Sequence, residues 1–561
     1  MSRFPDSLMP ARPVWLTALL AASLTLTACG GATTQSTTDD STDSSSQTSN
    51  DSSSTDNSST DSSSGSGSDN SSGSGSSDSG STDSGSGSDS GSGSDSGSDP
   101  DSGSASNSAP VVSAGADQYL YTGASATLAG SATDADGDSL TSSWTIISKP
   151  DGSSASISSA SSLSATLVTD IAGQYQLQLS VSDGEASSTD QVSITTAGWI
   201  LNTSDRSTYI TESSTGVLVN VQSVSSGSQS GTAYLTVSAT GIPDYTVTLT
   251  QADIDSLNAR PNAATDFTGG ATSASSGDVI QFGESIGYKT TGPGCDLGYW
   301  PPGPACPSDQ DKVQKLPTEP EPASTTCATS INSIGLMLNG TAIFNWDDGQ
   351  SYNSANVWNN LAPVFEQYDV DICMGHAQQQ GNYHHHMYSA CLQTLLQDSG
   401  TGHSPIYGFA ADGYPIYGPY YSAGVLAKPS WVKRDYSAAS ESGCGVEGVR
   451  RCQLNDQYDL SKGTKLVTVG PTTSATVTTQ SGNSITAVSG VYFEDYYHDA
   501  TLTALGGEYL DEHNGHDHDG LGYHYHVTAE LVSGSLSPVF PYQIGPTFYG
   551  ELPAATFAIC D

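Results

Sequence analysis

The stretch from Gly30 to Ser108 constrains the fold most, because it cannot contribute to a hydrophobic core. It consists almost entirely of Ser, Asp, Gly, Asn and Thr, and it contains neither Lys nor Arg. Such a segment has little apolar surface to bury and carries charges of one sign, which predicts a solvated spacer. An acidic tail that binds calcium is the alternative. The folded part of this 561-residue chain is therefore expected after residue 108.

The residues before the spacer combine a positive start, an apolar run and a cysteine: Arg3, Arg12, Val14–Ala28 and Leu26-Thr27-Ala28-Cys29-Gly30. The apolar run is too short for a membrane span. The pattern resembles a bacterial lipoprotein signal, which implies removal of residues 1–28 and lipidation of Cys29. A protein anchored in the cell envelope, at the outer membrane or cell surface, with residues 29–108 as its tether, is the expectation. Ordinary secretion with an incidental Cys29 is the alternative.

The charge of the chain argues against one class of partners. Acidic residues number 59 against 15 Lys and Arg, and the formal net charge is −44 at pH 7. Nucleic acids and anionic membrane surfaces attract proteins through positive charge, so neither is expected to bind this protein electrostatically. The membrane contact that we expect is made by the lipid on Cys29.

Eight cysteines remain when Cys29 is assigned to the anchor, and all lie in the C-terminal part of the chain. An even number in an exported chain indicates disulfides. Spacing favours three local pairs and leaves a fourth, although the sequence does not determine the connectivity: Cys295/Cys306, Cys373/Cys391, Cys444/Cys452 and Cys327/Cys560. The chain has no CxxC motif, so neither a zinc ribbon nor a thioredoxin-like redox site is indicated.

Residues 109–197 contain short alternating runs bounded by Gly, Asp and Ser, at the spacing of a β-sandwich. The predicted strands include Tyr119–Tyr121, Ala126–Leu128, Leu163–Leu167 and Tyr175–Val181. With Trp144 and Ser182-Asp183-Gly184, this segment resembles a PKD-type immunoglobulin-like domain. The resemblance implies a spacer or adhesion module rather than an active site.

Three alternate carboxylates in this segment suit a calcium ion: Asp134, Asp136 and Asp138. The run lacks the downstream Glu and the flanking helices of an EF-hand. A β-turn in which Asp side chains cap their own backbone is the favoured interpretation, and calcium binding is the alternative.

All eleven histidines lie at or after His376, and five of them form two similar motifs. The motifs are Tyr383-His384-His385-His386 and Tyr523-His524-Tyr525-His526. Alternate side chains of a strand share a face, so the first and last histidine of each motif project together. The tyrosines project to the opposite face.

Further blocks accompany the motifs: Leu338–Asn345, His403-Ser404-Pro405-Ile406, Asp412–Gly418 and Leu510–Gly515. On these residues the region 198–561 resembles a YHYH-domain protein. The resemblance implies a β-rich domain, which we expect to carry long, disulfide-stapled loops and one short helix at Ala390–Leu396. His385 stands where the family has Tyr. His513 stands where it often has Cys, which puts one family disulfide in doubt and offers a further imidazole.

Imidazole is a ligand for several transition metals, of which copper(II) and zinc are favoured here. We expect the two motifs to face each other, so that four imidazoles share one ion: His384, His386, His524 and His526. His376 and His403 are the next candidate ligands. Residues expected to orient the ligands are Asp412, Tyr383, Tyr523 and Tyr525.

Two other interpretations of the histidines stay open: a structural network of hydrogen-bonded His and Tyr, and acid–base catalysis without a metal. The sequence His516-Asp517-His518-Asp519-Gly520 is interpreted as a separate polar turn, with a second metal site as its alternative.

The sequence thus predicts a mainly β, surface-tethered lipoprotein whose YHYH domain binds a transition metal. A metal-handling module and a metalloenzyme that activates water or O₂ both fit this prediction. The alternative is a non-catalytic surface protein with a protein or glycan partner. In that case an aromatic platform for glycans is offered by Trp300, Tyr407, Tyr414 and Tyr417, although Tyr and Pro at this density more often pack loops.

Overall fold

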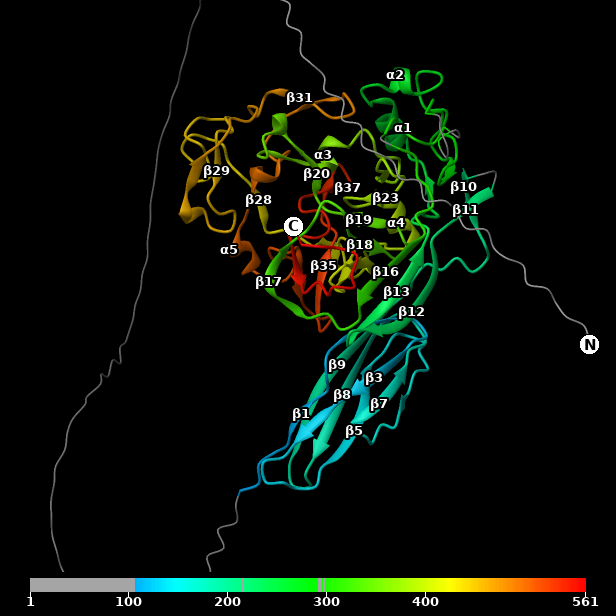
Figure 1. The fold of residues 1–561 in the computed structure, drawn as a ribbon, viewed down its shortest axis with the longest axis vertical. Helices are drawn as coiled ribbons and strands as arrows, with labels where there is room; N and C mark the ends of the chain where they lie inside the picture. Colours follow the sequence, from blue (N-terminus) through cyan, green and yellow to red (C-terminus); the bar gives the residue numbers. More distant parts are fainter. Residues whose placement is uncertain (1–105, 213–214, 291–294, 296–297, 304, 561) are drawn as a thin grey trace, which may run out of the picture. The chain divides into compact units, whose positions relative to one another are not determined.

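The computed structural model describes residues 106–560 apart from 213–214, 291–294, 296–297 and 304 (Figure 1). The lipoprotein-like signal, Cys29 and nearly all of the spacer lie outside the described residues. The described chain is mainly β, as predicted, with an immunoglobulin-like sandwich followed by a β-rich region with long loops. No helix in the described part of the chain is long and apolar enough to cross a membrane.

The sandwich is built from strands β1 to β9. Their bounds are β1 Val111–Ser113, β2 Gln118–Tyr121, β3 Ser125–Ala129, β4 Ser131–Thr133, β5 Thr141–Ser148, β6 Ile157–Ser158, β7 Ser164–Val168, β8 Gly173–Ser182 and β9 Ser187–Ala197. One sheet has the order β2-β9-β8-β5 and another the order β3-β7-β6. Alternate residues of β8 are buried, and Trp144 packs with them in one core. The four predicted strands are therefore confirmed.

An eight-stranded sheet forms the centre of the C-terminal region, with the order β22-β23-β19-β18-β24-β25-β35-β34. The bounds are β18 Ser333–Met337, β19 Ala342–Phe344, β22 His376–Ala377, β23 Tyr383–His385, β24 Ile406–Ala410, β25 Pro415–Tyr417, β34 Gly515–Asp517 and β35 Tyr523–His526. Figure 1 shows β18, β19 and β35 in the middle of this region. Both histidine motifs therefore lie on strands of one sheet.

The eight strands are arranged as two equivalent halves. In the first half, β18 and β19 form a hairpin, β23 carries the histidine motif and runs parallel to β19, and β22 pairs antiparallel with β23 at the edge. In the second half, β24 and β25 form the hairpin, β35 carries the motif and runs parallel to β25, and β34 pairs antiparallel with β35. The halves meet where β18 pairs antiparallel with β24. This pairing relates them by an approximate two-fold axis, so the same local geometry occurs once near each edge of the sheet.

The sequence contains the same duplication. Residues 371–386 and 511–526 align without a gap, and both have Asp at the start, Gly-His in the middle and Tyr-His-x-His at the end. Met374 and Asn514 occupy equivalent places and have positive φ values of 61° and 70°. The aspartate that begins each copy accepts a hydrogen bond from the backbone N–H of the glycine four residues later, at 3.1 Å and 3.0 Å.

Further strands, three 3-10 helices (η1 Tyr352–Ser354, η2 Leu460–Lys462 and η3 Phe493–Asp495) and five α-helices complete the described part of the region. The α-helices are α1 Gln251–Asn258, α2 Ala263–Asp266, α3 Ala362–Phe365, α4 Ala390–Leu395 and α5 Ala500–Thr503. The remaining strands are β10 Ser207–Glu212, β11 Thr215–Leu218, β12 Val221–Gln229, β13 Thr232–Ala239, β14 Thr246–Thr248, β15 Val279–Gln281, β16 Lys312–Pro317, β17 Pro322–Ala328, β20 Asp347–Ser351, β21 Asn359–Leu361, β26 Tyr420–Ser422, β27 Val425–Leu426, β28 Trp431–Lys433, β29 Cys452–Leu454, β30 Thr464–Leu466, β31 Thr476–Thr478, β32 Ser484–Thr486, β33 Tyr496–His498, β36 Ala529–Val532, β37 Ser535–Pro538 and β38 Thr547–Gly550. The predicted helix at Ala390–Leu396 is confirmed by α4.

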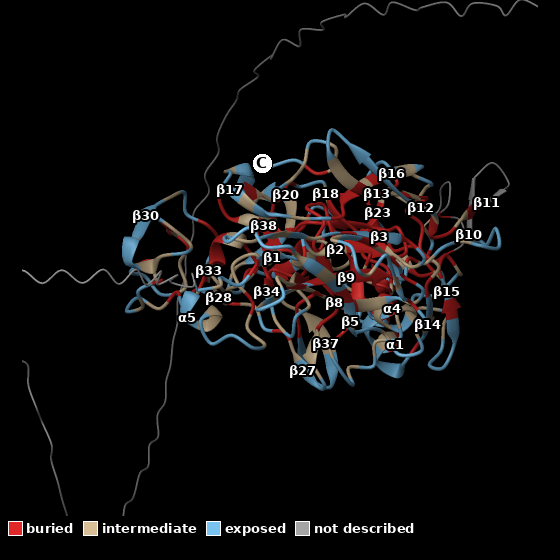
Figure 2. Cartoon of the chain, turned by 90° about the horizontal axis from the view of Figure 1, so that it is seen from below, coloured by how far each residue is buried: buried red, intermediate tan, exposed pale blue. Residues whose placement is uncertain are grey.

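Four disulfides staple the loops, with the pairing that spacing favoured. They are Cys295–Cys306, Cys327–Cys560, Cys373–Cys391 and Cys444–Cys452, with Cα–Cα distances of 5.6, 5.0, 5.3 and 5.5 Å. The Cys373–Cys391 bridge joins the segment before β22 to α4, which follows the first histidine motif. Buried residues concentrate around the central strands, and exposed residues lie in the outer hairpins such as β30 (Figure 2).

Two glycines at the junction of the halves allow β18 and β24 to pair closely. A Cβ atom on Gly335 would lie 2.7 Å from the carbonyl oxygen of Phe409, and one on Gly408 would lie 2.5 Å from that of Leu336. Both neighbours are backbone atoms of the partner strand, so neither can move without disturbing the sheet. The equivalent glycines thus hold the two halves together.

We predict that Gly335→Ala and Gly408→Ala each lower the free energy of unfolding by about 1–3 kcal/mol, as overpacked cores do. Urea unfolding measures the change. Gly227→Ala is the matched control, because no heavy atom lies within 4 Å of its added Cβ. A loss of stability in the control equal to that in the two variants would contradict this account.

Candidate metal centres

Three imidazoles and one carboxylate converge at one end of the central sheet, and we call them the first centre. They are His376 on β22, His384 on β23, His386 directly after β23 and Glu366 at the end of α3. His384 Nε2 lies 3.0 Å from His386 Nε2. Glu366 Oε2 lies 3.2 Å from the Nε2 atoms of His376 and His386. Two atoms bound to one tetrahedral zinc ion would be about 3.3 Å apart, so these separations suit a single ion.

Backbone carbonyls determine which nitrogen of each imidazole faces the first centre. His384 Nδ1 donates to the carbonyl oxygen of Asn382 at 2.9 Å, and His386 Nδ1 donates to that of Asn345. A carbonyl oxygen only accepts, so Nδ1 carries the proton and Nε2 of a neutral ring has a lone pair. If both rings are neutral, two lone pairs face each other across 3.0 Å, and a proton or a metal ion between them would remove their repulsion.

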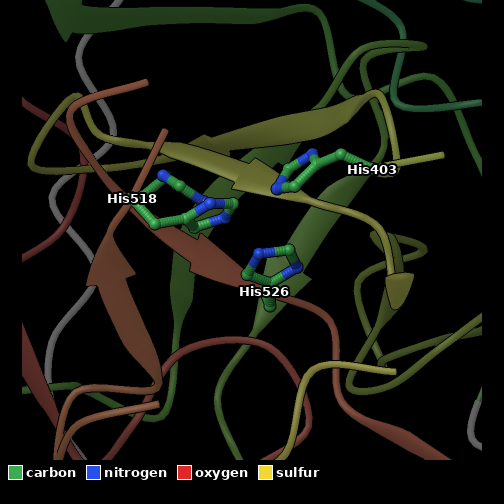
Figure 3. A group of neighbouring side chains, drawn as sticks. His403, His518 and His526 are labelled. Atoms are coloured by element: carbon green, nitrogen blue, oxygen red, sulfur yellow. The ribbon is translucent and has the colours of Figure 1, made fainter. Parts of the chain in front are cut away.

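The second centre lies near the opposite edge of the sheet. It consists of His524 and His526 on β35, His518 after β34 and His403 before β24, and their candidate ligand atoms all lie within 4.8 Å of one another. Figure 3 shows the rings of His403, His518 and His526 turned toward one another. His516 on β34 adjoins the group, with its ring centroid 5.0 Å from that of His524. The second centre is thus built from imidazoles.

The second centre has the same tautomers as the first. Nδ1 of His524 donates to the carbonyl oxygen of Gly522 and Nδ1 of His526 to that of Gly418, both at 2.7 Å. His403 Nδ1 donates to the carbonyl oxygen of Ser404 at 2.8 Å. The Nε2 atoms of all three rings are buried and have no hydrogen-bond partner among the described residues. Metal-binding histidines are oriented in this way, by a bond from the nitrogen that does not bind the metal.

Burial keeps most of these imidazoles neutral. It is the main cause that lowers the pKa of His384, His524 and His526 well below the usual range, and neighbouring imidazoles add to it. The pKa of His403 falls to about 4 for the same main reason. Neutral imidazole is the form that binds metals.

Glu366 changes the charge balance in the first centre. Burial alone would lower the pKa of His376 and raise that of Glu366. Their mutual attraction outweighs burial, so the pKa of His376 is raised and that of Glu366 is held well below its usual range. The first centre therefore includes an ion pair. In the second centre, Asp519 Oδ2 lies 3.4 Å from His518 Nδ1.

The prediction of one shared site is wrong. His384 and His386 belong to one group and His524 and His526 to another. Strands β23 and β35 are five steps apart in the sheet, or about 24 Å at the usual strand spacing. The similar motifs do not face each other because they occupy equivalent positions in the two halves of the sheet.

Sequence reasoning missed Glu366 as a member of the first centre, and it offered a metal site at His516 and His518 only as the alternative to a polar turn. The 516–520 stretch is not a separate turn, because His516 pairs with His524 across β34 and β35. The missed signal is the gapless alignment of 371–386 with 511–526, which makes His516 the equivalent of the candidate His376. Glu366 has no comparable signal in the sequence.

A family profile described as YHYH protein matches residues 313–443. The chain contains a YHYH domain. A second profile, described as a PKD domain, matches residues 114–196, so the sandwich is a PKD domain. The YHYH match includes the first centre and His403, and it ends before β34 and β35. No curated protein matches the chain.

Three solved structures have local similarity to the chain. The PKD domain from KIAA 1837 protein is 27% identical, over 16% of this chain and 85% of that chain, with a TM-score of 0.14. The PKD domain from human KIAA0319 is 21% identical, over 18% and 93%, with a TM-score of 0.16. Endo-fucoidan hydrolase MfFcnA9 is 25% identical, over 18% and 16%, with a TM-score of 0.13. At these TM-scores, none of them bears on the function of the YHYH domain.

The tyrosines of the YHYH motifs bind aspartates rather than orienting imidazoles. Tyr383 donates to Asp371 at 2.9 Å and Tyr523 to Asp511 at 3.0 Å. Tyr525 donates to Asp412 at 2.5 Å. Asp412 was expected to orient a metal-facing histidine, but backbone carbonyls do so in both centres. Asp412 instead anchors the opposite face of the motif strand.

Two further predictions concern residues outside the centres. The four aromatic residues pack inside the domain and do not form a platform, since Trp300, Tyr407, Tyr414 and Tyr417 are all buried. The imidazole of His513, a possible further ligand, contacts Thr547 instead. Its Nδ1 lies 2.8 Å from the hydroxyl oxygen of Thr547. It does not belong to either centre.

The aspartates of the PKD domain form a capped turn. Asp134 Oδ1 accepts hydrogen bonds from the backbone N–H groups of Asp136, Gly137 and Asp138 at 2.9, 2.9 and 3.2 Å. The favoured interpretation, a turn that caps itself, agrees with these bonds. One oxygen from each of the three aspartates also lies within 4.8 Å of the others, and calcium binding there stays a prediction.

We predict that Tyr525→Phe lowers the free energy of unfolding by about 1–3 kcal/mol, because it leaves the buried Asp412 carboxyl without its phenol donor. Thermal unfolding measures the effect. Tyr288→Phe is the control, because the Tyr288 hydroxyl is buried and has no hydrogen-bond partner among the described residues. Equal losses of stability in the two variants would contradict the role given to the Tyr525–Asp412 bond.

Proposed function

We propose that the YHYH domain is a transition-metal-binding domain with two separate centres. One observation carries the proposal: the Nε2 atoms of His384 and His386 lie 3.0 Å apart while both Nδ1 atoms donate to backbone carbonyls. Two neutral acceptors repel each other at that distance, and a bound cation removes the repulsion. The second centre supports the same conclusion through its unpartnered, buried Nε2 atoms.

A structural hydrogen-bond network explains the centres less well. Buried polar atoms in such a network find partners, because an unsatisfied buried group costs about 1–3 kcal/mol. In the second centre the Nε2 atoms of His403, His516, His524 and His526 have none among the described residues. A proton shared between His384 and His386 would satisfy the first centre alone. A metal ion is the cation that suits both.

Copper(II) and zinc are the metals that we propose, because both accept imidazole and neither requires a thiolate. The eight cysteines of the C-terminal region are all in disulfides, so none offers a thiolate there. We further propose that lipidation of Cys29 anchors the chain to the cell envelope and that residues 29–108 hold the domains away from the membrane. The lipoprotein-like pattern at Leu26–Gly30 supports this location.

We predict that the purified full chain binds about two copper or zinc ions, measured by elemental mass spectrometry. The double variant His384→Gln/His386→Gln is expected to lose about one ion, and His524→Gln/His526→Gln the other, because each pair belongs to a different centre. Near-ultraviolet circular dichroism verifies that the variants remain folded.

The matched control for these variants is His498→Gln. His498 is a buried histidine outside both centres, and its Nε2 lies 2.9 Å from the Thr503 hydroxyl oxygen. It is expected to retain both ions. A full chain without stoichiometric metal would refute the proposal, and loss of all metal from either double variant would refute the two separate centres.

We also predict that a chelator lowers the melting temperature of the wild-type chain. A metal at 100 times its dissociation constant stabilises the folded state by about 2.7 kcal/mol for each site. Readdition of copper or zinc is expected to restore the melting temperature. An identical melting temperature in chelator and in excess metal would show that these ions do not bind the folded chain.

A further inference from the structure

We infer that the first centre is open to a small organic ligand. The ligand class that we assign is an amino alcohol, whose ammonium group binds cavity carboxylates while a hydroxyl oxygen reaches the metal. This inference rests on the proposed metal at the first centre. It assigns that centre the role of a substrate site.

Two adjoining cavities open beside the first centre. Their volumes are about 260 and 330 Å³, and they share Asp348, Glu366, His376, Gln379 and Gln480 as lining residues. His384 and His386 also line the smaller cavity. The larger volume is within the range of small-molecule sites, about 300–1,000 Å³. A ligand in these cavities would contact the residues that hold the metal.

Unpartnered atoms mark this wall of the cavities as a binding surface. His376 is 6% exposed, and its two ring nitrogens make no hydrogen bond with a described residue. Glu366 Oε2 is also buried. It lies 3.2 Å from the Nε2 atoms of His376 and His386, but neither contact has the geometry of a hydrogen bond. These groups attract one another as an ion pair, and their unused hydrogen-bonding capacity suits a metal and a ligand beyond it.

The lining residues select against anions. Four carboxyl groups face the two cavities, from Asp347, Asp348, Glu366 and Asp369, and the described lining has no Lys or Arg. Burial raises the pKa of Asp348 to about 7 and that of Asp369 to about 6. A cation beside them would favour their ionised forms. The cavities therefore suit a positively charged group.

The duplication explains why the two centres hold different numbers of imidazoles. Gln378 in the first copy aligns with His518 in the second, and Gln378 lines the smaller cavity. His518 instead contributes an imidazole to the second centre, and His403 contributes another. The second centre thus has four candidate imidazole ligands, whereas the first has three and faces the two carboxyl-lined cavities.

The test uses the purified full chain loaded with Co²⁺, whose visible spectrum reports its coordination, and three sugars of similar size. Glucosamine is a cationic amino alcohol, glucose is neutral and glucuronate is an anion. We expect glucosamine to change the Co²⁺ spectrum at concentrations at least tenfold lower than glucose, and glucuronate to have no effect. An effect of glucuronate at the glucosamine concentration, or no effect of glucosamine, would overturn the inference.

Variants locate the effect. Asp348→Asn preserves the shape of a half-buried carboxyl and is expected to weaken the glucosamine response at least tenfold. Gln378→His introduces the imidazole of the second centre and is expected to abolish the response while the cobalt content is unchanged. Glu319→Gln removes an exposed charge outside both cavities and is the control. A glucosamine response that is equal in Asp348→Asn and in the control would refute the assignment.

Metal content and the Co²⁺ spectrum test metal binding and ligand binding separately. If His384→Gln/His386→Gln has the same metal content as the wild type, the proposed first centre is wrong. If the first centre holds its metal and glucosamine leaves the spectrum unchanged, the metal site stands and the ligand assignment is wrong.

Discussion

The hydrogen bond from imidazole Nδ1 to a backbone carbonyl is the interaction on which both centres depend. A carbonyl can only accept, so this bond determines the tautomer and leaves the Nε2 lone pair free. It also determines the direction of the ring, because His386 and His526 reach equivalent carbonyls at Asn345 and Gly418, directly after β19 and β25. The hairpins therefore do more than complete the sheet, since they aim the imidazoles at a common point.

Strand alternation supplies the other half of this arrangement. The first and last histidine of each motif project to one face of the sheet, and the tyrosines project to the other. There Tyr383, Tyr523 and Tyr525 donate to buried or partly buried aspartates, which ties each motif strand to the loops behind it. One face can thus carry unpartnered nitrogens because the opposite face is held by hydrogen bonds.

The two-fold arrangement of the sheet separates the centres and has let them diverge. Both retain the Tyr-His-x-His strand and the histidine of the edge strand, His376 or His516. Around this shared part, the first centre has Glu366 and borders a carboxyl-lined cavity, and the second has His403 and His518. A carboxylate offsets part of the charge of a bound ion, whereas a neutral imidazole leaves that charge unchanged. One scaffold thus offers two chemically distinct sites.

Much of this protein follows from local sequence pattern. Period-two alternation identified the strands of the PKD domain and the shared face of each His-x-His pair, and cysteine spacing favoured the disulfides that the structure contains. These properties depend on neighbours within a few residues, or on simple elimination among eight cysteines. The duplication of 371–386 in 511–526 is also present in the sequence, and it identifies His516 as the equivalent of His376.

Only the tertiary structure decided how the motifs relate to each other. Their similarity suggested one shared site, yet strand order separates them by five positions, and strand order is a long-range property that no local pattern contains. Glu366 joins the first centre from α3, and His403 joins the second from the segment before β24. Local sequence thus determined which imidazoles point together, and the pairing of distant strands determined which carboxylates, carbonyls and further imidazoles meet them.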